Sequence, residues 1–509
     1  MHIKFKIHKD HMILMAILLF GIILRIVELG KLPLGMSHDE AYAGYEAWAL
    51  YRYGIDSHGY KNPVYLTVWG SGMSALYSYL TIPFLHIFQQ LSPVIIRIPQ
   101  VLFGCMTLPA FYYIVSKINS KLKMLALFLL TISPWHIALS RFGLDCNLAV
   151  AFLVFGMAAF LKAQEHIKYL WLSMLCYGLS LYCYAIVWIL VPFIVAISTA
   201  YLWYNKRLVF DKNVVIGYII LFFTALPLLL FVAVNFIGGG YLDEIKLTFL
   251  SIPKLPGGRA HEFGFSINNM RRIYDIIFNQ YDGQNQNALP YFGICYLCST
   301  PFMLIGLTSS WFAAVESAKK RIFQSETVML IQFVVVLVCG CMIQEVNINK
   351  INGLFVPEIY FVAKGIYIIK EEWYSQITAL VISIYLLALF AWIDEYQVIM
   401  SSYYTSGYEE ALEYAIQNAG DHEIGISDLP YSYVLFETKI APEDFIRTVK
   451  YTNYPDPWLH VAEFDRFVFD YDAELPGHLW YVLPSEKQEK WIEKGFKIRY
   501  FGDFSVAFR

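Results

Sequence analysis

Eleven apolar runs, each close to twenty residues long, dominate this sequence. A helix of about 20 apolar residues spans the hydrocarbon core of a bilayer, which is about 30 Å thick. The runs lie near residues 12–29, 95–116, 122–140, 147–164, 168–183, 186–204, 213–236, 289–311, 326–344, 351–369 and 374–394. The third run contains Pro134, and the fifth and sixth almost touch, so these boundaries are the loosest. The pattern predicts a mainly α-helical, polytopic membrane protein with about eleven transmembrane helices.

The composition agrees with a membrane location. Of the 509 residues, 58% are hydrophobic and 16% are charged, whereas soluble domains average about 25% charged residues. The sequence shows no phosphate-binding glycine loop, zinc-ligand spacing or nucleic-acid-binding motif. The eight cysteines lie in or beside apolar runs, where packing is their usual role.

The positions of Lys and Arg predict the orientation, because positive residues near short loops stay on the cytoplasmic side. With the N-terminus inside, the inside segments hold fifteen Lys and Arg residues, and the short outside loops hold only Arg141 and Lys350. We therefore expect a multi-pass plasma-membrane protein with a cytoplasmic N-terminus and an extracytoplasmic C-terminal tail.

Two outer loops interrupt a predicted transmembrane domain over residues 1–396. The loop at 30–94 ends in an apolar stretch broken by Gly70, Ser71 and Gly72, which predicts helices at the membrane interface. The loop at 237–290 is rich in glycine and proline, and loops of this length are usually functional or disordered.

The C-terminal tail, residues 397–509, differs sharply in chemistry. From residue 400 onward it holds 10 Lys and Arg against 19 Asp and Glu, whereas the preceding residues hold 28 against 22. Periodicity predicts both helices and strands in it. The helices are expected at 407–419, 442–450 and 485–494, and the strands at 423–427, 478–483, 496–501 and 504–508. We expect a small extracytoplasmic α/β domain without disulfides, since the tail has no Cys.

An acidic pair, Asp39-Glu40, follows the first apolar run directly. Ionisable groups at a membrane boundary cost free energy unless water or partners satisfy them, which makes such a pair a candidate functional site. The alternative is the solvated start of a loop.

Several short segments resemble a known family. They are SHDEAYAGYEAW at 37–48, GIDSHG at 54–59, NPVY at 62–65, IRIP at 96–99, SPWH at 133–136 and Ser140-Arg141. Together they resemble the bacterial polytopic glycosyltransferases of the GT-C class, in particular the protein O-mannosyltransferase and aminoarabinose-transferase relatives (the family 39-like group). The resemblance covers roughly residues 10–370 and is most specific around the acidic pair.

The resemblance implies an inverting transferase that moves a sugar from a polyprenyl-phosphate carrier to an acceptor at the outer membrane face. Asp39 would match the catalytic carboxylate that deprotonates the acceptor, and Glu40 would orient the acceptor or the Asp39 proton. The acceptor, whether protein, lipid or polysaccharide, is left open.

Other polar residues are candidates for binding substrate. Arg141 beside His136, and Lys350 with Asn352, could stabilise phosphate charge, although cations at helix ends are often only interfacial anchors. His58 and Lys61 share the loop of the acidic pair and could contact substrate, although a solvated loop is the alternative. The resemblance implies that Asp282, in the loop at 237–290, caps the active-site cavity, whereas its local sequence alone indicates only a polar turn.

No cofactor is expected. A divalent metal between Asp39, Glu40 and Asp282 is chemically conceivable, but the resembled enzymes imply none. Two rival functions remain: a transporter or flippase of lipid-linked sugars, which would favour polar residues within the spans, and a non-catalytic surface scaffold that binds through its tail.

Overall fold

The computed structural model describes residues 9–208, 211–237, 242–258, 264–343, 345–373, 376–404, 406–469 and 477–509, so the N-terminal Lys4 and Lys6 lie outside the described residues. The chain divides into two compact units. The bundle unit comprises Met1–Leu29, Gln100–Leu226 and His261–Gln397. The loop-and-tail unit comprises Gly30–Pro99, Pro227–Ala260 and Val398–Arg509, and so joins the segment of the acidic pair to the C-terminal tail.

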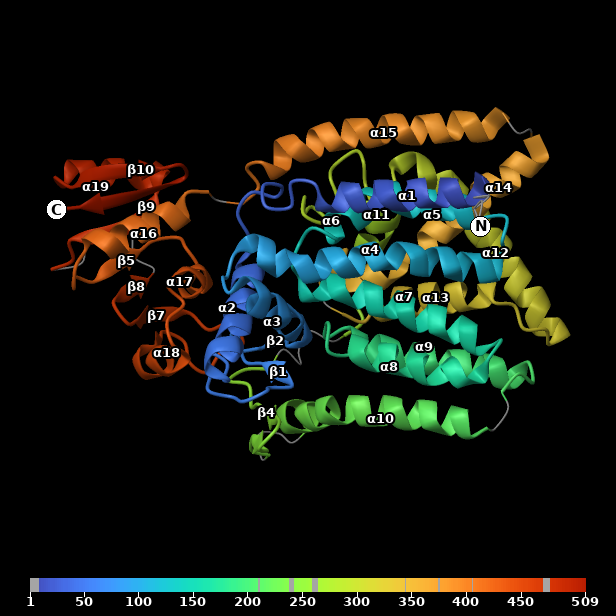
Figure 1. Ribbon diagram of the computed structural model, residues 1–509, viewed down its shortest axis with the longest axis horizontal. Coiled ribbons are helices and arrows are strands. Elements are labelled where there is room, and N and C mark those ends of the chain that lie inside the picture. Colours follow the sequence, from blue (N-terminus) through green and yellow to red (C-terminus); the bar gives the residue numbers. More distant parts are fainter. Residues whose placement is uncertain are drawn as a thin grey trace, which may run out of the picture. The chain divides into compact units, whose positions relative to one another are not determined.

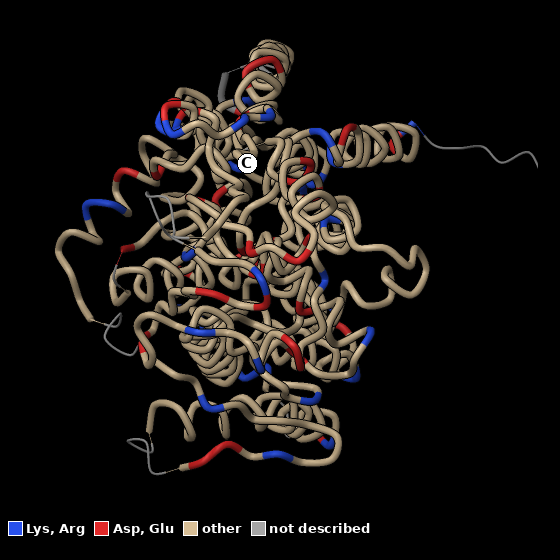
Figure 2. The backbone as a smooth tube through the Cα atoms, turned by 90° about the vertical axis from the view of Figure 1, so that its left-hand side faces the viewer, with Lys and Arg blue, Asp and Glu red and all other residues tan. Residues whose placement is uncertain are grey.

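Seven helices within the described residues are long and apolar enough to cross a membrane. They are α4 (Pro93–Ile118), α7 (Asp145–Ala163), α9 (Val187–Tyr204), α10 (Lys212–Val232), α12 (Thr300–Lys320), α14 (Phe355–Trp373) and α15 (Gln376–Met400). Each falls on one of the predicted apolar runs. Figure 2 shows that residues other than Lys, Arg, Asp and Glu make up most of the backbone. The prediction of a mainly helical polytopic membrane protein is confirmed.

The predicted number of eleven spanning helices is not confirmed. The other four runs form shorter or more charged helices within the described part of the chain: α1 (Lys9–Ile26), α5 (Lys123–Ile132), followed by α6 (Pro134–Leu139), α8 (Leu170–Ser180) and α13 (Glu326–Gly340). The third run breaks because Pro134 cannot donate a backbone hydrogen bond, and Ser133 instead caps α6 by accepting one from the backbone N of His136.

Most of the long helices of the bundle unit lie side by side with nearly parallel axes, and α12 slopes across them (Figure 1). Neighbouring pairs include α1 with α5, α7 with α8, α9 with α13 and α12 with α14. The last pair can approach closely because Gly306 and Gly365 lack side chains. A Cβ at Gly306 would lie 1.9 Å from the carbonyl O of Phe361, and one at Gly365 would lie 1.9 Å from that of Phe302. Helices α7 and α14 are the most buried of the seven, so they form the centre of this unit.

In the loop-and-tail unit, the first loop forms α2 (His38–Tyr53), a hairpin of β1 (Tyr65–Leu66) and β2 (Met73–Ser74), and α3 (Leu76–Phe88). The loop after α10 adds the short hairpin of β3 (Ile245–Lys246) and β4 (Ser251–Ile252). In the bundle unit, the remainder of that loop forms α11 (Ile267–Phe278).

The tail folds around a seven-stranded sheet, which confirms the predicted α/β domain. The strand order is β10-β11-β9-β5-β8-β7-β6, and β5 runs parallel to both β8 and β9 while the other pairs are antiparallel. The strands are β5 (Ile424–Ile426), β6 (Lys450–Tyr451), β7 (Val461–Phe464), β8 (Phe467–Phe469), β9 (Trp480–Pro484), β10 (Lys497–Phe501) and β11 (Phe504–Phe508). The helices are α16 (Tyr408–Asn418), α17 (Tyr431–Thr438), α18 (Pro442–Thr448) and α19 (Glu489–Glu493). All seven predicted tail elements are present, whereas α17 and the three strands β6 to β8 were not predicted.

Candidate functional site

The acidic pair lies in the first turn of α2, where the helix begins with a capping box. The backbone N of Glu40 donates to the Ser37 hydroxyl at 3.1 Å, and the backbone N of Ser37 donates to Glu40 Oε2 at 3.0 Å. This reciprocal arrangement satisfies two of the amide groups that a helix start leaves open. The two carboxylates are therefore held by a defined helix start.

The two carboxylates of the pair point to different surroundings. The side chain of Glu40 is 1% exposed and accepts a hydrogen bond from Arg97 Nε at 2.9 Å, while Arg97 also donates to the carbonyl O atoms of Pro33 and Gly35. The side chain of Asp39 is 47% exposed, and its Oδ1 lies 3.7 Å from Nε2 of the similarly exposed His38. Because adjacent helical residues are about 100° apart around the axis, one member is buried and the other faces outward.

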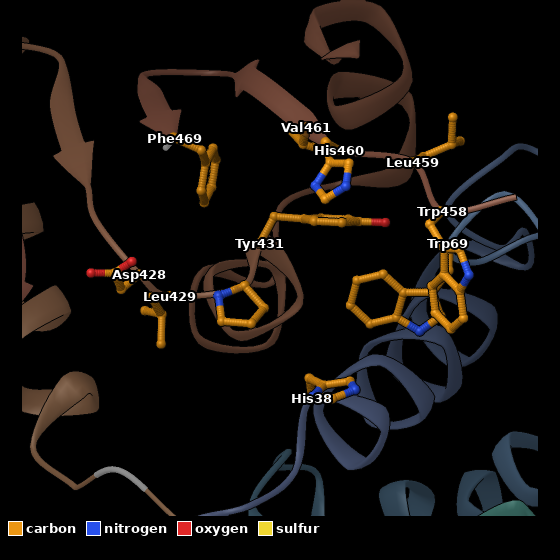
Figure 3. Close-up of a pocket in the computed structure, with 11 residues that line it drawn as sticks. His38, Trp69, Asp428, Leu429, Tyr431, Trp458, Leu459, His460, Val461 and Phe469 are labelled. Carbon is orange, nitrogen blue, oxygen red and sulfur yellow. The ribbon is translucent and has the colours of Figure 1, made fainter. Parts of the chain in front are cut away.

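A pocket of about 470 Å³ lies beside this turn of α2 and belongs entirely to the loop-and-tail unit. Aromatic rings and imidazoles make up much of its lining, and Figure 3 shows those of His38, Trp69, Tyr431, Trp458 and His460 grouped around a common space, while the Asp428 carboxylate points away from it. The lining residues are His38, Trp69, Asp428, Leu429, Pro430, Tyr431, Trp458, Leu459, His460, Val461 and Phe469. His38, the neighbour of Asp39, contributes an imidazole that meets the Trp69 ring edge-on at 5.5 Å between centroids.

Backbone pairing brings the first loop and the tail together at this pocket. The amide N of Leu459 donates to the carbonyl O of Trp69 at 2.8 Å, and Gly70 forms an antiparallel bridge with Trp458. Gly70 has φ +92°, and a Cβ at this position would lie 2.3 Å from the carbonyl O of Asp456, so the close approach requires glycine. The Trp69 ring in turn contacts Tyr431 edge-on at 5.3 Å.

A second carboxylate cluster lies at the other end of α2. Ser57 in the following loop folds back and donates both its backbone N, at 3.0 Å, and its hydroxyl to Glu46. Asp56 Oδ1 accepts from the backbone N atoms of His58 and Tyr60, and its Oδ2 has no hydrogen-bond partner in the described structure. Burial raises the pKa of both carboxyls, and repulsion by Asp56 raises that of Glu46 further.

The predicted substrate ligand His58 belongs to this cluster, and the structure does not bring it to Asp39. Its Nδ1 lies 2.9 Å from the Ser57 hydroxyl, and burial lowers its pKa to about 4, so the imidazole is neutral at physiological pH. Lys61 lies in the same loop and is exposed. The sequence analysis missed Glu46, although a carboxylate amid the small residues of α2 (Ala43, Gly44 and Ala47) is a sign of a buried partner.

In the bundle unit, the side chains of His136 and Arg141 both contact α1. Arg25 of α1 lies 2.7 Å from His136 Nδ1, and its guanidinium also donates to the carbonyl O atoms of Gly21 and Thr131. Arg141 donates to the carbonyl O atoms of Leu24, at 3.2 Å, and Arg25, at 3.3 Å. These contacts place a cation at the C-terminal end of α1, where helix carbonyls lack intrahelical partners.

The structure brings Asn352, Lys350 and Asp282 into one neighbourhood of the bundle unit. Asn352 accepts from Trp135 Nε1 at 2.9 Å and is buried, while Lys350, two residues earlier, is half-buried. Asp282 Oδ2 accepts from the backbone N of Ile348 at 2.9 Å and from Asn287 Nδ2 at 2.8 Å. Asp282 therefore holds the loop that leads into α14 against the predicted cavity loop.

Within the described residues, no three His, Cys, Asp or Glu side chains gather as ligands for a metal ion. Both oxygens of Glu40 already accept hydrogen bonds, from Arg97 and from the Ser37 backbone. Asp39 is thus the member of the pair that is open to a substrate.

These features define a polytopic membrane protein with a carboxylate at the start of the first loop helix. No protein-family model matches the sequence. No curated protein matches it either. The likeness is found among solved structures, at sequence identities low enough that it shows the fold alone.

Two solved structures are similar over nearly the whole chain. The crystal structure of ArnT from Cupriavidus metallidurans in the apo state has a TM-score of 0.58 and 10% identity, with 98% of each chain covered. The same protein bound to undecaprenyl phosphate has a TM-score of 0.57, with 10% identity and 97% of each chain covered.

An archaeal protein extends the likeness. The oligosaccharyltransferase of Archaeoglobus fulgidus, in complex with Zn and sulfate, has a TM-score of 0.54 and 13% identity and covers 84% of this chain. This chain spans 61% of that protein's length. The expected GT-C fold is thereby confirmed.

Proposed function

We propose that the protein is an inverting glycosyltransferase that moves a sugar from a polyprenyl-phosphate-linked donor to an acceptor at the outer face of the cytoplasmic membrane. The observation that carries the proposal is the separation of the acidic pair. In a chain with the GT-C fold, Asp39 is fixed by a capped helix start yet stays half exposed beside an aromatic pocket, while Glu40 is buried against Arg97.

In this mechanism Asp39 is the general base. Its carboxylate takes the proton from the acceptor nucleophile as the nucleophile forms a bond to the anomeric carbon from the face opposite the phosphate. The bond between the anomeric carbon and the phosphate oxygen breaks with its electron pair, which yields an inverted glycoside and polyprenyl phosphate. Glu40 is a positioning residue, because it fixes the first turn of α2 through Ser37 and Arg97.

The leaving phosphate gains negative charge and needs a cation near it. We assign this role to Lys350, which lies in the half-buried segment leading into α14, beside Asn352. Arg141 and His136 are proposed to act indirectly, because their side chains hold α1. No metal is invoked for either step.

The orientation of the chain in the membrane follows from the same proposal. A lipid-linked donor carries its reactive bond at headgroup depth, so Asp39 belongs at that depth on the extracytoplasmic side. The excess of Lys and Arg in the alternate short loops supports a cytoplasmic N-terminus and an extracytoplasmic tail.

The test is sugar transfer by membranes supplied with a panel of radiolabelled polyprenyl-phosphate sugars. The variant Asp39→Asn keeps the shape of the side chain and removes its basicity, and Asp421→Asn, at an exposed position in the tail, is the matched control. We expect Asp39→Asn to lower transfer at least roughly a hundredfold at equal protein level, within the range of general base catalysis, with the control unchanged.

Two results would redirect the assignment. Transfer by Asp39→Asn at the wild-type rate would show that Asp39 is not the general base and would disprove this mechanism. Consumption of no donor in the panel, together with movement of the intact lipid-linked sugar across vesicles, would favour the transporter.

A further inference from the structure

The aromatic pocket beside α2 is a second functional feature of the loop-and-tail unit. We propose that it binds a neutral pyranose ring and thereby holds a carbohydrate acceptor for transfer. The ligand class rests on the pocket itself, and its role as acceptor rests on the proposed function.

The pocket lies where an α/β sheet ordinarily binds a ligand. From β5 the chain passes to β8 on one side of β5 and then to β9 on the other side, with both neighbours parallel to β5. Ligands of open α/β sheets bind beyond the carboxyl ends of the strands at such a reversal of strand order. Asp428 to Tyr431, which follow β5, and Phe469, which ends β8, all line the pocket.

The lining suits a sugar ring. A pyranose presents apolar C–H faces for stacking and hydroxyl groups at its edge, so it needs flat aromatic surfaces with polar groups around them. Trp69, Tyr431, Trp458 and Phe469 supply the rings, and the imidazoles of His38 and His460 supply hydrogen-bonding groups (Figure 3). A volume of about 470 Å³ falls within the range of small-ligand sites, roughly 300–1,000 Å³.

The charges of the pocket argue against an anionic ligand. No Lys or Arg belongs to the lining, and its single carboxylate, Asp428, pairs with Lys487 at 2.5 Å. A phosphate group or an acidic sugar would therefore find no Lys or Arg in the lining to offset the cost of burying its charge. A neutral saccharide meets no such penalty.

The backbone of the pocket argues against an extended peptide. A peptide that adds to a sheet edge needs unpaired backbone groups. Here the carbonyl O of Trp69 already accepts from the backbone N of Leu459, and the backbone N of His460 already donates to Asn453 Oδ1 at 2.8 Å. Asn453 Nδ2 also donates to the carbonyl O of Trp458 at 2.6 Å. These backbone groups of the loop are therefore already engaged within the protein and do not offer an edge for a peptide.

The pocket also lies close to the proposed base along the chain. His38 lines it and precedes Asp39 directly, with His38 Nε2 3.7 Å from Asp39 Oδ1. A sugar stacked on Trp69 and Trp458 can present a hydroxyl group toward the first turn of α2. The pocket would thus select the acceptor while Asp39 activates it.

Ligand-observed saturation-transfer NMR on the full-length protein in detergent tests this without requiring turnover. The probes are methyl α-D-mannopyranoside, maltose and N,N′-diacetylchitobiose, with a tyrosine-containing peptide and a short-chain phosphatidylglycerol as competitors. We expect saturation of the C–H protons on one ring face of at least one sugar. We also expect Trp458→Ala to weaken its binding roughly tenfold, as for the loss of one stacking partner.

The variants separate binding from folding and from catalysis. Trp458 is 50% exposed, and His460→Ala provides a second, smaller change in the same lining. Tyr500→Ala removes a ring that is 58% exposed on the edge strand β10 and should leave binding unchanged. Asp39→Asn should bind the sugar normally while failing to transfer.

Several outcomes would overturn the pocket assignment. These are the absence of saturation from all three sugars, binding that survives both Trp458→Ala and His460→Ala, and displacement of the sugar by the peptide or the lipid at lower concentration. If sugar binding is found but Asp39→Asn transfers normally, the proposed base fails and the pocket stands.

Discussion

Arg97 Nε donates to Glu40 Oε1 at 2.9 Å, and both side chains are buried, at 0% and 1% exposure. This ion pair explains why two adjacent carboxylates play different parts. It fixes Glu40 as a structural anion at the start of α2 and leaves Asp39 as the carboxylate that can meet a substrate. Two carboxylates that look alike in the sequence therefore have different surroundings and different roles in the fold.

The first prediction concerns the stability of this pair. Arg97→Met leaves Glu40 as an unpaired buried anion, which costs about 3–5 kcal/mol in comparable cases. The midpoint of thermal unfolding in detergent should fall, whereas Arg52→Met, at an exposed position in the last turn of α2, should change it little. The double variant Glu40→Gln/Arg97→Met should lose less than the two single variants combined, and strict additivity would disprove the coupling.

The second prediction concerns pH and the cluster at the other end of α2. Burial raises the pKa of Glu46 to about 8 and that of Asp56 to about 7, so the folded protein holds protons that the unfolded chain has released. The free energy of unfolding should therefore fall as pH rises from about 5 to about 8. Glu46→Gln keeps an acceptor for Ser57 and should flatten this dependence of the unfolding temperature.

The control for the pH prediction is Glu443→Gln, which neutralises an exposed carboxylate in the same unit. It should retain the wild-type slope between pH 5 and pH 8, because this substitution leaves the buried carboxyl groups of Glu46 and Asp56 in place. Equal slopes for wild type and Glu46→Gln would show that Glu46 releases its proton in the folded protein as readily as in the unfolded one.

Local patterns in the sequence predicted most of the secondary structure. Apolar runs of membrane length identified the seven long helices, and hydrophobic periodicity located strands such as β9 and β11 in the tail. The break at Pro134 was visible as a proline, but the sequence alone did not show that Ser133 would cap a new helix. The acidic pair was found because charge at a membrane boundary is costly.

The pocket could not be predicted, because its walls come from distant parts of the chain. Trp69 and Tyr431 are 362 positions apart in the sequence, and their ring contact depends on a bridge between Gly70 and Trp458. Periodicity reports which face of an element is apolar, and it carries no information about which other element covers that face. The burial of Glu40 escaped prediction for the same reason, since its partner Arg97 lies 57 residues away.

The third prediction tests the backbone pairing of Gly70 with Trp458, which joins the first loop to the tail. Gly70→Ala places a methyl group against the carbonyl O of Asp456 and imposes a side chain on a residue with φ +92°. Both effects are unfavourable, and the backbone conformation alone costs about 1–2 kcal/mol. Gly54→Ala is the matched control because Gly54 has φ +73° with no neighbouring atom within 4 Å of its Cβ position.

Comparison of the two glycine variants separates strain from collision. Gly54→Ala should lose only the conformational part of the stability, whereas Gly70→Ala should lose more and should also weaken sugar binding in the aromatic pocket. Equal unfolding temperatures for the two variants, with sugar binding intact, would show that the backbone around Gly70 and Asp456 can shift to accept a methyl group without loss of stability.

The fourth prediction separates the two cations considered for the phosphate. Arg141 donates to carbonyl O atoms at the end of α1, so Arg141→Gln should lower the unfolding temperature, with a loss of about 1.5–3 kcal/mol for a charged hydrogen bond. Lys350→Gln should instead reduce kcat/KM for the lipid-linked donor by roughly 10- to 100-fold, as for loss of a group that stabilises developing charge. Lys350→Arg keeps the positive charge and should recover part of this rate. If Lys350→Gln transfers at the wild-type rate while Arg141→Gln loses activity without unfolding earlier, the two roles are reversed, and Arg141 becomes the cation that receives the leaving phosphate.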